Sequence, residues 1–110
     1  MQKLKIGIVV ADYDEYAPFV NGIDSSTKKE YKYFTRKAIE FEFDNAQIVC
    51  INCGIGKVNA ATAAMHLVDI GCNCVLNFGL SGGISRVRRG EIVLPEKFLE
   101  HDFDLTGIGY

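Results

Sequence analysis

The chain has 110 residues and a formal net charge of −2, with 48% hydrophobic and 24% charged residues. This length suits one domain with a modest core, and the composition is ordinary for a globular protein. Without a net positive charge, a nucleic-acid partner is not expected. No apolar run approaches the ~20 residues of a membrane-spanning helix, so no membrane partner is expected and a cytoplasmic location is the default.

The first half of the chain predicts a strand, a helix and a pair of strands. Residues 5–10 are almost continuously apolar, which is typical of a buried strand. A helix is expected to start at Asp14 or just before it, because Pro18 is tolerated only near a first turn. Residues 31–35 and 38–43 are expected to form two antiparallel strands, since the second of them alternates strictly between apolar and polar side chains.

The second half predicts a strand, a long helix and further strands. The helix covers residues 57–71 and is expected to end at Gly71. Its apolar side chains fill one arc, which comprises Val58, Ala61, Ala64, Met65, Leu67 and Val68. His66 lies on the opposite, polar arc and is expected to be solvated. The expected strands of this half are residues 47–53, 74–78, 91–94 and 96–100.

This order of elements predicts an α/β fold with a mixed central sheet flanked by helices. Ligands of such sheets gather beyond the carboxyl ends of the strands, where three loops carry informative residues, namely 11–15, 54–57 and 79–83. If the strands before these loops are parallel, the loops converge and place a carboxylate beside two glycine-lined backbone surfaces. The spacing matches neither a dinucleotide-binding fingerprint nor a phosphate-binding P-loop, so it predicts only a small-molecule site.

The four cysteines, Cys50, Cys53, Cys72 and Cys74, have a spacing that invites a zinc interpretation. Burial is the better interpretation, because both pairs lie in apolar runs and cysteine is among the most buried residue types. Side chains alternate along a strand, so Cys50 and Cys53 are expected to point to opposite faces. No metal is therefore expected at these cysteines, and the chain as a whole implies no organic cofactor.

Five stretches together resemble the nucleoside phosphorylase and nucleosidase superfamily, most closely its methylthioadenosine/S-adenosylhomocysteine nucleosidases. They are KIGIVVADYDE (5–15), CGIGKVNAATAA (53–64), NFGLSGG (77–83), GEIVLPE (90–96) and HDFDLTGIGY (101–110). The resemblance implies a phosphorylase/hydrolase-like fold, of which residues 1–110 form the N-terminal part of a single, truncated domain. Family members continue into a second half, which supplies ribose-binding residues and an aspartate that protonates the purine.

Glu15 falls where the family's water-activating carboxylate stands, so the resemblance implies a catalytic role for it. A carboxylate beside the sugar carbon can take a proton from water as that water attacks an oxocarbenium-like centre. The alternative interpretation is structural. Glu15 could instead complement the helix dipole, or form a capping box with Asp12.

The resemblance also implies a set of residues that bind the substrate. Ile55 matches a position that lines the pocket for the 5′ substituent of a nucleoside. The glycine-rich loop provides Gly79, Leu80, Ser81 and Gly82, against whose backbone the nucleoside is expected to lie. Leu105 and Ile108 match positions that a neighbouring subunit lends to the same pocket, which implies a homodimer.

Asn77 stands where phosphorylases of the superfamily commonly place a phosphate-binding arginine, so water is the expected nucleophile. Leu80, Asp12 and Tyr13 depart from the usual nucleosidase pattern, which leaves the exact nucleoside open. The sequence thus predicts a purine nucleosidase acting on methylthioadenosine or adenosylhomocysteine. Two alternatives stay open, a nucleoside phosphorylase and a non-catalytic nucleoside-binding module.

Overall fold

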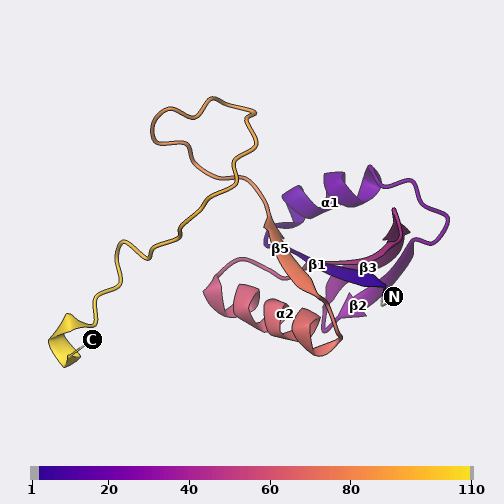
Figure 1. Cartoon of the computed structure of the whole chain (residues 1–110), viewed down its shortest axis with the longest axis horizontal. Helices are drawn as coiled ribbons and strands as arrows, with labels where there is room; N and C mark the ends of the chain where they lie inside the picture. The colour runs from indigo at the N-terminus through magenta and orange to yellow at the C-terminus, as the bar shows by residue number, and fades with distance from the viewer. Residues whose placement is uncertain (1–2, 110) are drawn as a thin grey trace.

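The computed structural model describes residues 3–109, which form a five-stranded sheet between two helices, followed by an extended segment (Figure 1). The elements in chain order are β1 (Leu4–Val10), α1 (Tyr13–Asn21), β2 (Lys29–Tyr33), β3 (Arg36–Phe43), β4 (Ala46–Asn52), α2 (Lys57–Asp69), β5 (Cys74–Phe78) and the short 3-10 helix η1 (Thr106–Ile108). The expected α/β fold with a mixed sheet is confirmed.

The strand order in the sheet is β2-β3-β4-β1-β5. β1 runs parallel to β4 on one side and to β5 on the other, whereas β3 is antiparallel to both β2 and β4. The carboxyl ends of β4, β1 and β5 therefore lie at one edge of the sheet. From the sequence, the three loops after these strands are expected to converge if the strands are parallel. The parallel arrangement is confirmed.

Two tight hairpins join the antiparallel strands. Asp44 and Asn45 connect β3 to β4 with φ angles of 46° and 65°, the left-handed pair typical of a two-residue hairpin turn. Phe34, with a φ of 53°, and Thr35 connect β2 to β3. This second turn places Arg36 at the start of β3, directly opposite Tyr33.

The core lies on both faces of the sheet because side chains alternate along each strand. On the α2 face, Val9, Val49 and Ile51 pack with Leu67 of the helix. On the α1 face, the corresponding residues are Val10, Ile39, Ile48 and Cys50, packed with Tyr16 and Val20. Cys50 and Cys53 fall in different clusters, so the prediction that they face opposite sides is confirmed.

The face of α2 that is buried against the sheet is not the whole apolar arc predicted from the sequence. Ala63 and Leu67 are buried, whereas Val58, Met65 and Val68 are more than half exposed. The helix leans on β1 where Gly7 leaves room. An added Cβ at Gly7 would lie 2.8 Å from Cδ1 of Leu67, so this contact fixes which face turns inward.

The expectation that His66 is solvated is wrong. The imidazole is partly buried and packs against the Tyr33 ring, with the two ring centroids 5.1 Å apart and the ring planes tilted by 49°. Leu67 is buried in the same cluster as Tyr33, and the adjacent His66 therefore lies against the end of β2.

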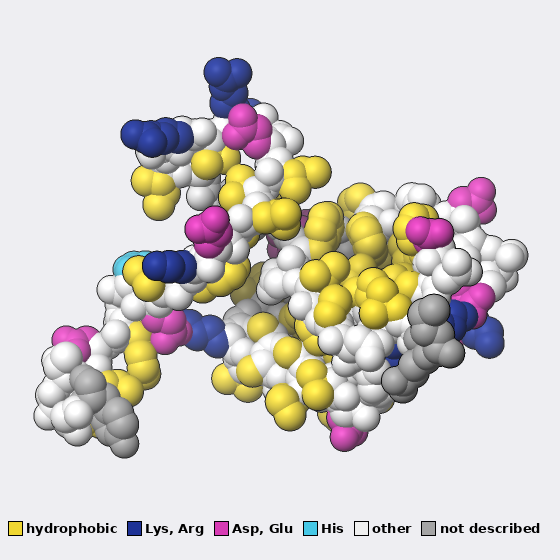
Figure 2. Space-filling view, in the orientation of Figure 1, with side chains coloured by type: hydrophobic (Ala, Val, Ile, Leu, Met, Phe, Trp, Pro, Cys, Tyr) yellow, Lys and Arg dark blue, Asp and Glu magenta, His cyan; other side chains and the backbone are white. Residues whose placement is uncertain are grey.

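The expected strands at residues 91–94 and 96–100 are wrong, because residues 79–105 contain no strand. This segment runs away from the sheet and pairs with none of its strands (Figure 1). A strand is stable only when its backbone groups pair with a neighbour, so apolar content alone does not produce one. Figure 2 shows hydrophobic side chains along this segment, and Ile84, Ile92 and Leu94 are at least 90% exposed.

Candidate functional site

Glu15 lies in the first turn of α1, at the carboxyl edge of the sheet. Its carboxylate reaches the loop after β5, where Oε1 accepts a hydrogen bond of 2.8 Å from the backbone N–H of Leu80. This bond links α1 to the loop after β5, between residues that are 65 positions apart in the sequence. The side chain is half-buried.

Gly79 provides the space for this carboxylate. A Cβ added at Gly79 would lie 2.8 Å from Oε2 of Glu15 and 3.2 Å from its carboxyl carbon. Any side chain larger than hydrogen would therefore displace the carboxylate. The first of the three glycines in the 79–83 loop is explained by this close approach of backbone and carboxylate.

The start of α1 is capped by Asp12 rather than by Glu15. Oδ1 of Asp12 accepts a hydrogen bond of 3.0 Å from the backbone N–H of Asp14. The Glu15 carboxylate turns to Leu80, so it does not return to Asp12 to complete a capping box. The capping-box alternative is therefore wrong, and the helix begins at Tyr13, close to the predicted start.

A buried asparagine that the sequence did not single out joins β4 to the loop after β1. Asn52 is 6% exposed, and its Nδ2 donates to the carbonyls of Val10 and Ala11 at 3.2 and 3.3 Å. It thereby fixes the backbone that leads to Asp12 and Glu15. No local pattern marks this role, because its two partners lie more than 40 residues away in the sequence.

The remaining candidate residues are not gathered around Glu15. Ile55 follows β4 and is 73% exposed, and Ser81 and Gly82 lie exposed beyond Leu80. Leu105 and Ile108 lie at the end of the extended segment, away from the sheet (Figure 1). Residues 3–109 alone therefore bring together only Glu15, Gly79 and Leu80.

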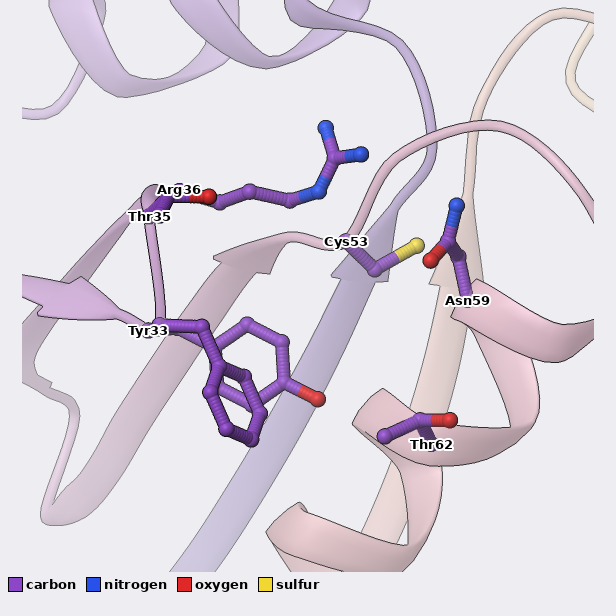
Figure 3. Close-up of a pocket in the computed structure, with 7 residues that line it drawn as sticks. Tyr33, Thr35, Arg36, Cys53, Asn59 and Thr62 are labelled. Carbon is purple, nitrogen blue, oxygen red and sulfur yellow. The ribbon is translucent and has the colours of Figure 1, made fainter.

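A separate pocket of about 220 Å³ lies between the β2–β3 hairpin and α2 (Figure 3). Its lining residues are Tyr33, Phe34, Thr35, Arg36, Cys53, Asn59 and Thr62. Glu15 lines neither this pocket nor the second one, which lies between α1 and the same hairpin. No sequence pattern marks Arg36 or Tyr33 as pocket residues, because an arginine beside a hairpin turn looks like an ordinary exposed side chain and a strand tyrosine like an ordinary core residue.

Burial raises the pKa of two titratable groups that line this pocket. Desolvation raises the pKa of the Tyr33 phenol, with a smaller contribution from the neighbouring Cys53. Desolvation also raises the pKa of the Cys53 thiol, and a backbone hydrogen bond and Arg36 oppose that shift. Both groups therefore stay protonated at neutral pH. Cys53 is a buried thiol, not a thiolate nucleophile.

Across residues 3–109, no three side chains of the metal-binding kinds lie close enough together to hold an ion. In the same part of the chain, no helix combines the length and apolar character needed to cross a bilayer.

Comparison with known proteins places this arrangement in a family. Residues 5–110 match the model of the phosphorylase superfamily. The chain belongs to this superfamily.

Among curated members, the chain is 31% identical to the 5′-methylthioadenosine/S-adenosylhomocysteine nucleosidase of Desulfotalea psychrophila. The match covers 97% of this chain and 46% of that protein. A nucleosidase of the same name from Colwellia psychrerythraea is 32% identical over 97% of this chain. The chain thus spans about half the length of the curated relatives it matches.

Solved structures of the superfamily share the fold. The Colwellia psychrerythraea nucleosidase, in complex with adenine, matches with a TM-score of 0.84 and 32% identity over 99% of this chain and 45% of its own. The S-adenosylhomocysteine nucleosidase of Streptococcus pyogenes, in complex with 5-methylthiotubericidin, has a TM-score of 0.86 and 25% identity. That match covers all of this chain and 47% of the other.

Proposed function

We propose that the intact protein is a cytoplasmic purine nucleosidase that hydrolyses the N-glycosidic bond of methylthioadenosine- and adenosylhomocysteine-type nucleosides. One observation carries the proposal. The Glu15 carboxylate is held at the open carboxyl edge of the sheet, against Gly79 and the Leu80 N–H. The names of the superfamily's matching members support the choice of substrate.

The geometry suits Glu15 to act as a general base. The Leu80 N–H occupies Oε1 and fixes the carboxylate, which leaves Oε2 to accept a proton from water. As that proton moves to Glu15, the water oxygen bonds to the sugar carbon and the bond from this carbon to the purine nitrogen breaks. The purine leaves with the bonding electron pair and takes up a proton from another group.

The glycine-rich loop is the proposed surface for the nucleoside. Gly79 and Leu80 lie exposed beside Glu15, and Ser81 and Gly82 lie exposed beyond them, so the backbone of this loop is open to a ligand. Ile55, also exposed, is assigned to the 5′ substituent because it follows β4, whose carboxyl end lies at the same edge of the sheet as that of β5. No metal or organic cofactor takes part in this proposal.

A homodimer is part of the proposal. Leu105 and Ile108 are 38% and 72% exposed and lie at the end of a segment that extends away from the sheet. This position suits contact with the pocket of a second copy better than contact with their own sheet. They are assigned to the pocket of the neighbouring subunit.

Phosphate dependence is the experiment that tests the choice between hydrolysis and phosphorolysis. Asn77 is exposed on β5, opposite Val9 of β1, and its neutral amide cannot neutralise a phosphate. Release of adenine from methylthioadenosine by the intact protein is expected without phosphate, with the free sugar as product. Activity that depends on added phosphate and yields the sugar 1-phosphate would identify a phosphorylase, and binding without turnover would identify a nucleoside-binding module.

A further inference from the structure

The pocket between the β2–β3 hairpin and α2 contains one unpaired cation. In the part of the chain that the structure describes, Arg36 is the only charged side chain that lines it. Among residues 3–109, the ion pairs join Lys3 to Glu42 and Lys57 to Glu100, and neither includes Arg36. The Arg36 side chain also donates no hydrogen bond within the described residues, so all its donors are free for a ligand.

The Arg36 guanidinium lies against the backbone of the loop after β4. A Cβ added at Gly54 would lie 2.4 Å from Cζ of Arg36 and 2.5–2.7 Å from its two terminal nitrogens. Gly54 has a φ of +90°, so glycine suits this position for its backbone angle as well as for the space it leaves. Figure 3 shows the side chain reaching from the hairpin over the carboxyl end of the sheet.

A second, independent observation points to a ligand in the same pocket. The Tyr33 side chain is only 6% exposed, yet its hydroxyl has no hydrogen-bond partner among residues 3–109. The hydroxyl points towards α2 (Figure 3). A buried polar group without a partner is costly, and most such groups are satisfied by protein, water or a ligand.

The helix side of the pocket offers acceptors. Asn59 donates from Nδ2 to the carbonyl of Ile55 at 2.8 Å, and Thr62 donates from Oγ1 to the carbonyl of Val58 at 2.7 Å. The Asn59 Oδ1 and the lone pairs of Thr62 remain as acceptors. The pocket therefore combines a cation at one end with acceptor oxygens at the other, which suits a zwitterionic group.

The pocket and Glu15 share one edge of the sheet. Gly54 follows β4 and Gly79 follows β5, with β1 between these two strands. Two strand spacings separate them, which is about 10 Å. One ligand can span this distance. The pocket's 220 Å³ is smaller than the ~300–1,000 Å³ of a complete small-molecule site, so it suits part of a ligand.

We infer that this pocket binds the α-amino acid end of S-adenosylhomocysteine, with its carboxylate on Arg36 and its ammonium group at the oxygens of Asn59, Thr62 and Tyr33. The inference rests on the proposed nucleosidase function and names the part of the substrate that this pocket recognises. Methylthioadenosine carries a methyl group in place of the amino acid. It leaves Arg36 without a partner and serves as an internal control.

The test compares the two nucleosides in steady-state kinetics of the intact protein. Arg36→Met is expected to raise KM for adenosylhomocysteine about 10- to 100-fold, the usual value of a charge-assisted pair. Its kcat should change less than about threefold, because the contact is the same in ground and transition states. Both constants for methylthioadenosine should stay within about twofold. Arg36→Lys should retain part of the selectivity, and Tyr33→Phe should raise KM for adenosylhomocysteine alone.

Lys29→Met is the matched control. Lys29 starts the same hairpin at its opposite end and is exposed, so the variant loses the same charge away from the pocket. Lys29→Met should change neither KM nor kcat for either nucleoside. Equal effects of Arg36→Met on both nucleosides, or no effect on either, would overturn the assignment.

Two further measurements separate this inference from the proposed function. If the intact protein releases adenine from neither nucleoside, calorimetry can measure the binding of both nucleosides to the wild type and to Arg36→Met. The variant is then expected to lose affinity for adenosylhomocysteine but not for methylthioadenosine. Free homocysteine and inorganic phosphate are the competing ligands. Saturable binding of either that is lost in Arg36→Met but does not compete with adenosylhomocysteine would assign the pocket to a separate ligand and overturn the inference.

Discussion

At the scale of single residues, two polar groups at the carboxyl edge of the sheet have opposite situations. The Glu15 carboxylate has a defined partner in the Leu80 N–H, which fixes its position. The Tyr33 hydroxyl is buried and has no partner among residues 3–109. Glu15 is the proposed general base, whereas the Tyr33 hydroxyl is left unpaired until a ligand binds. Conservative substitutions of the two residues should therefore affect different quantities, turnover for Glu15 and the free energy of unfolding for Tyr33.

Glu15→Gln should lower turnover of methylthioadenosine by the intact protein about 10²- to 10⁴-fold, the usual contribution of a positioned general base. The amide oxygen can still accept from the Leu80 N–H, so nucleoside binding should change little. Rapid-quench measurement of adenine release and calorimetric binding check the two parts. Asp14→Asn, one residue earlier in the same turn, is the control and should retain turnover. Near wild-type turnover of Glu15→Gln would contradict the catalytic role.

Tyr33→Phe should not destabilise the ligand-free protein, although Tyr33 is a buried residue. The substitution removes a hydroxyl that has no partner among residues 3–109 and keeps the ring that packs against His66. An unpaired buried hydroxyl costs about 1 kcal/mol or more, so the free energy of unfolding should stay constant or rise by about 1 kcal/mol. Urea unfolding of both proteins measures it. A loss of more than about 1 kcal/mol would mean that the hydroxyl has a partner.

At the scale of elements, α2 is attached to the sheet by few side chains. Ala63 and Leu67 are its buried residues, and Leu67 packs over Gly7 of β1. The larger apolar side chains Val58, Met65 and Val68 face outward, where residues 3–109 leave them exposed. The stability of the helix on the sheet thus depends on one large side chain, and not on the helix's overall apolar content.

Substitutions on the two faces of α2 should separate these contributions. Leu67→Ala should lower the free energy of unfolding by about 2–5 kcal/mol, because it leaves a cavity over Gly7. Met65→Ala, two residues away and 66% exposed, should lower it by about 0.5 kcal/mol or less. Urea unfolding of the two variants makes the comparison. A loss for Met65→Ala as large as that for Leu67→Ala would mean that the outer face is covered in the intact protein.

A buried thiol in β4, the most buried strand, should make the free energy of unfolding fall at alkaline pH. Burial raises the pKa of the Cys50 thiol from 9.0 to about 12. Above pH 9 the unfolded chain releases this proton while the folded chain keeps it, so the stabilisation present below pH 9 is lost as pH rises towards 12. Each such group contributes about 1.4 kcal/mol per pH unit in that interval.

The pH prediction is checked with Cys50→Ala. Between pH 9.5 and 11.5, the free energy of unfolding of the wild type should fall more steeply than that of the variant, by about 1.4 kcal/mol per pH unit. The pKa of Tyr31 is raised to about 12 mainly by burial, and Cys50 is the smallest of its causes, so most of the Tyr31 contribution cancels in the difference. Parallel slopes for the two proteins would mean that Cys50 titrates normally in the folded state.

At the scale of the whole molecule, residues 3–109 expose more surface than a compact chain of this size. The accessible surface is 9080 Å², whereas a compact monomer of 12.2 kDa exposes about 6,100 Å². The radius of gyration is 16.0 Å against about 13 Å for a compact domain. Much of the excess comes from the segment after β5, whose apolar side chains are open to solvent (Figure 2).

Residues 1–110 produced alone should therefore self-associate and release no adenine. Exposed apolar side chains and the unpaired edge of β5 favour association with further copies. Glu15 can activate water, but a purine leaves slowly unless it is protonated, and no residue near Glu15 in this part of the chain is assigned that role. Light scattering and an adenine-release assay on one sample test both points. A stable monomer that cleaves methylthioadenosine would contradict the proposal that further residues complete the site.

The sequence by itself determined the elements of the sheet and the position of Glu15. β1, β4 and β5 are short apolar runs followed by glycine or polar residues, and α2 has a helical repeat that ends at Gly71, with a φ of +93°. These signals are local, because hydrophobic alternation and backbone preference act within a few residues. The stretches that resemble the superfamily are also contiguous, and this is why the family could be predicted correctly.

Only the tertiary structure decided which residues meet. Glu15 binds Leu80 across 65 residues, Arg36 lies against Gly54, and Tyr33 packs against His66, and none of these pairs has a local signal. The inward face of α2 was decided by the space over Gly7, not by the helix's own apolar arc. Residues 91–100 have enough apolar side chains for strands, but they form none because no strand lies beside them to pair with their backbone.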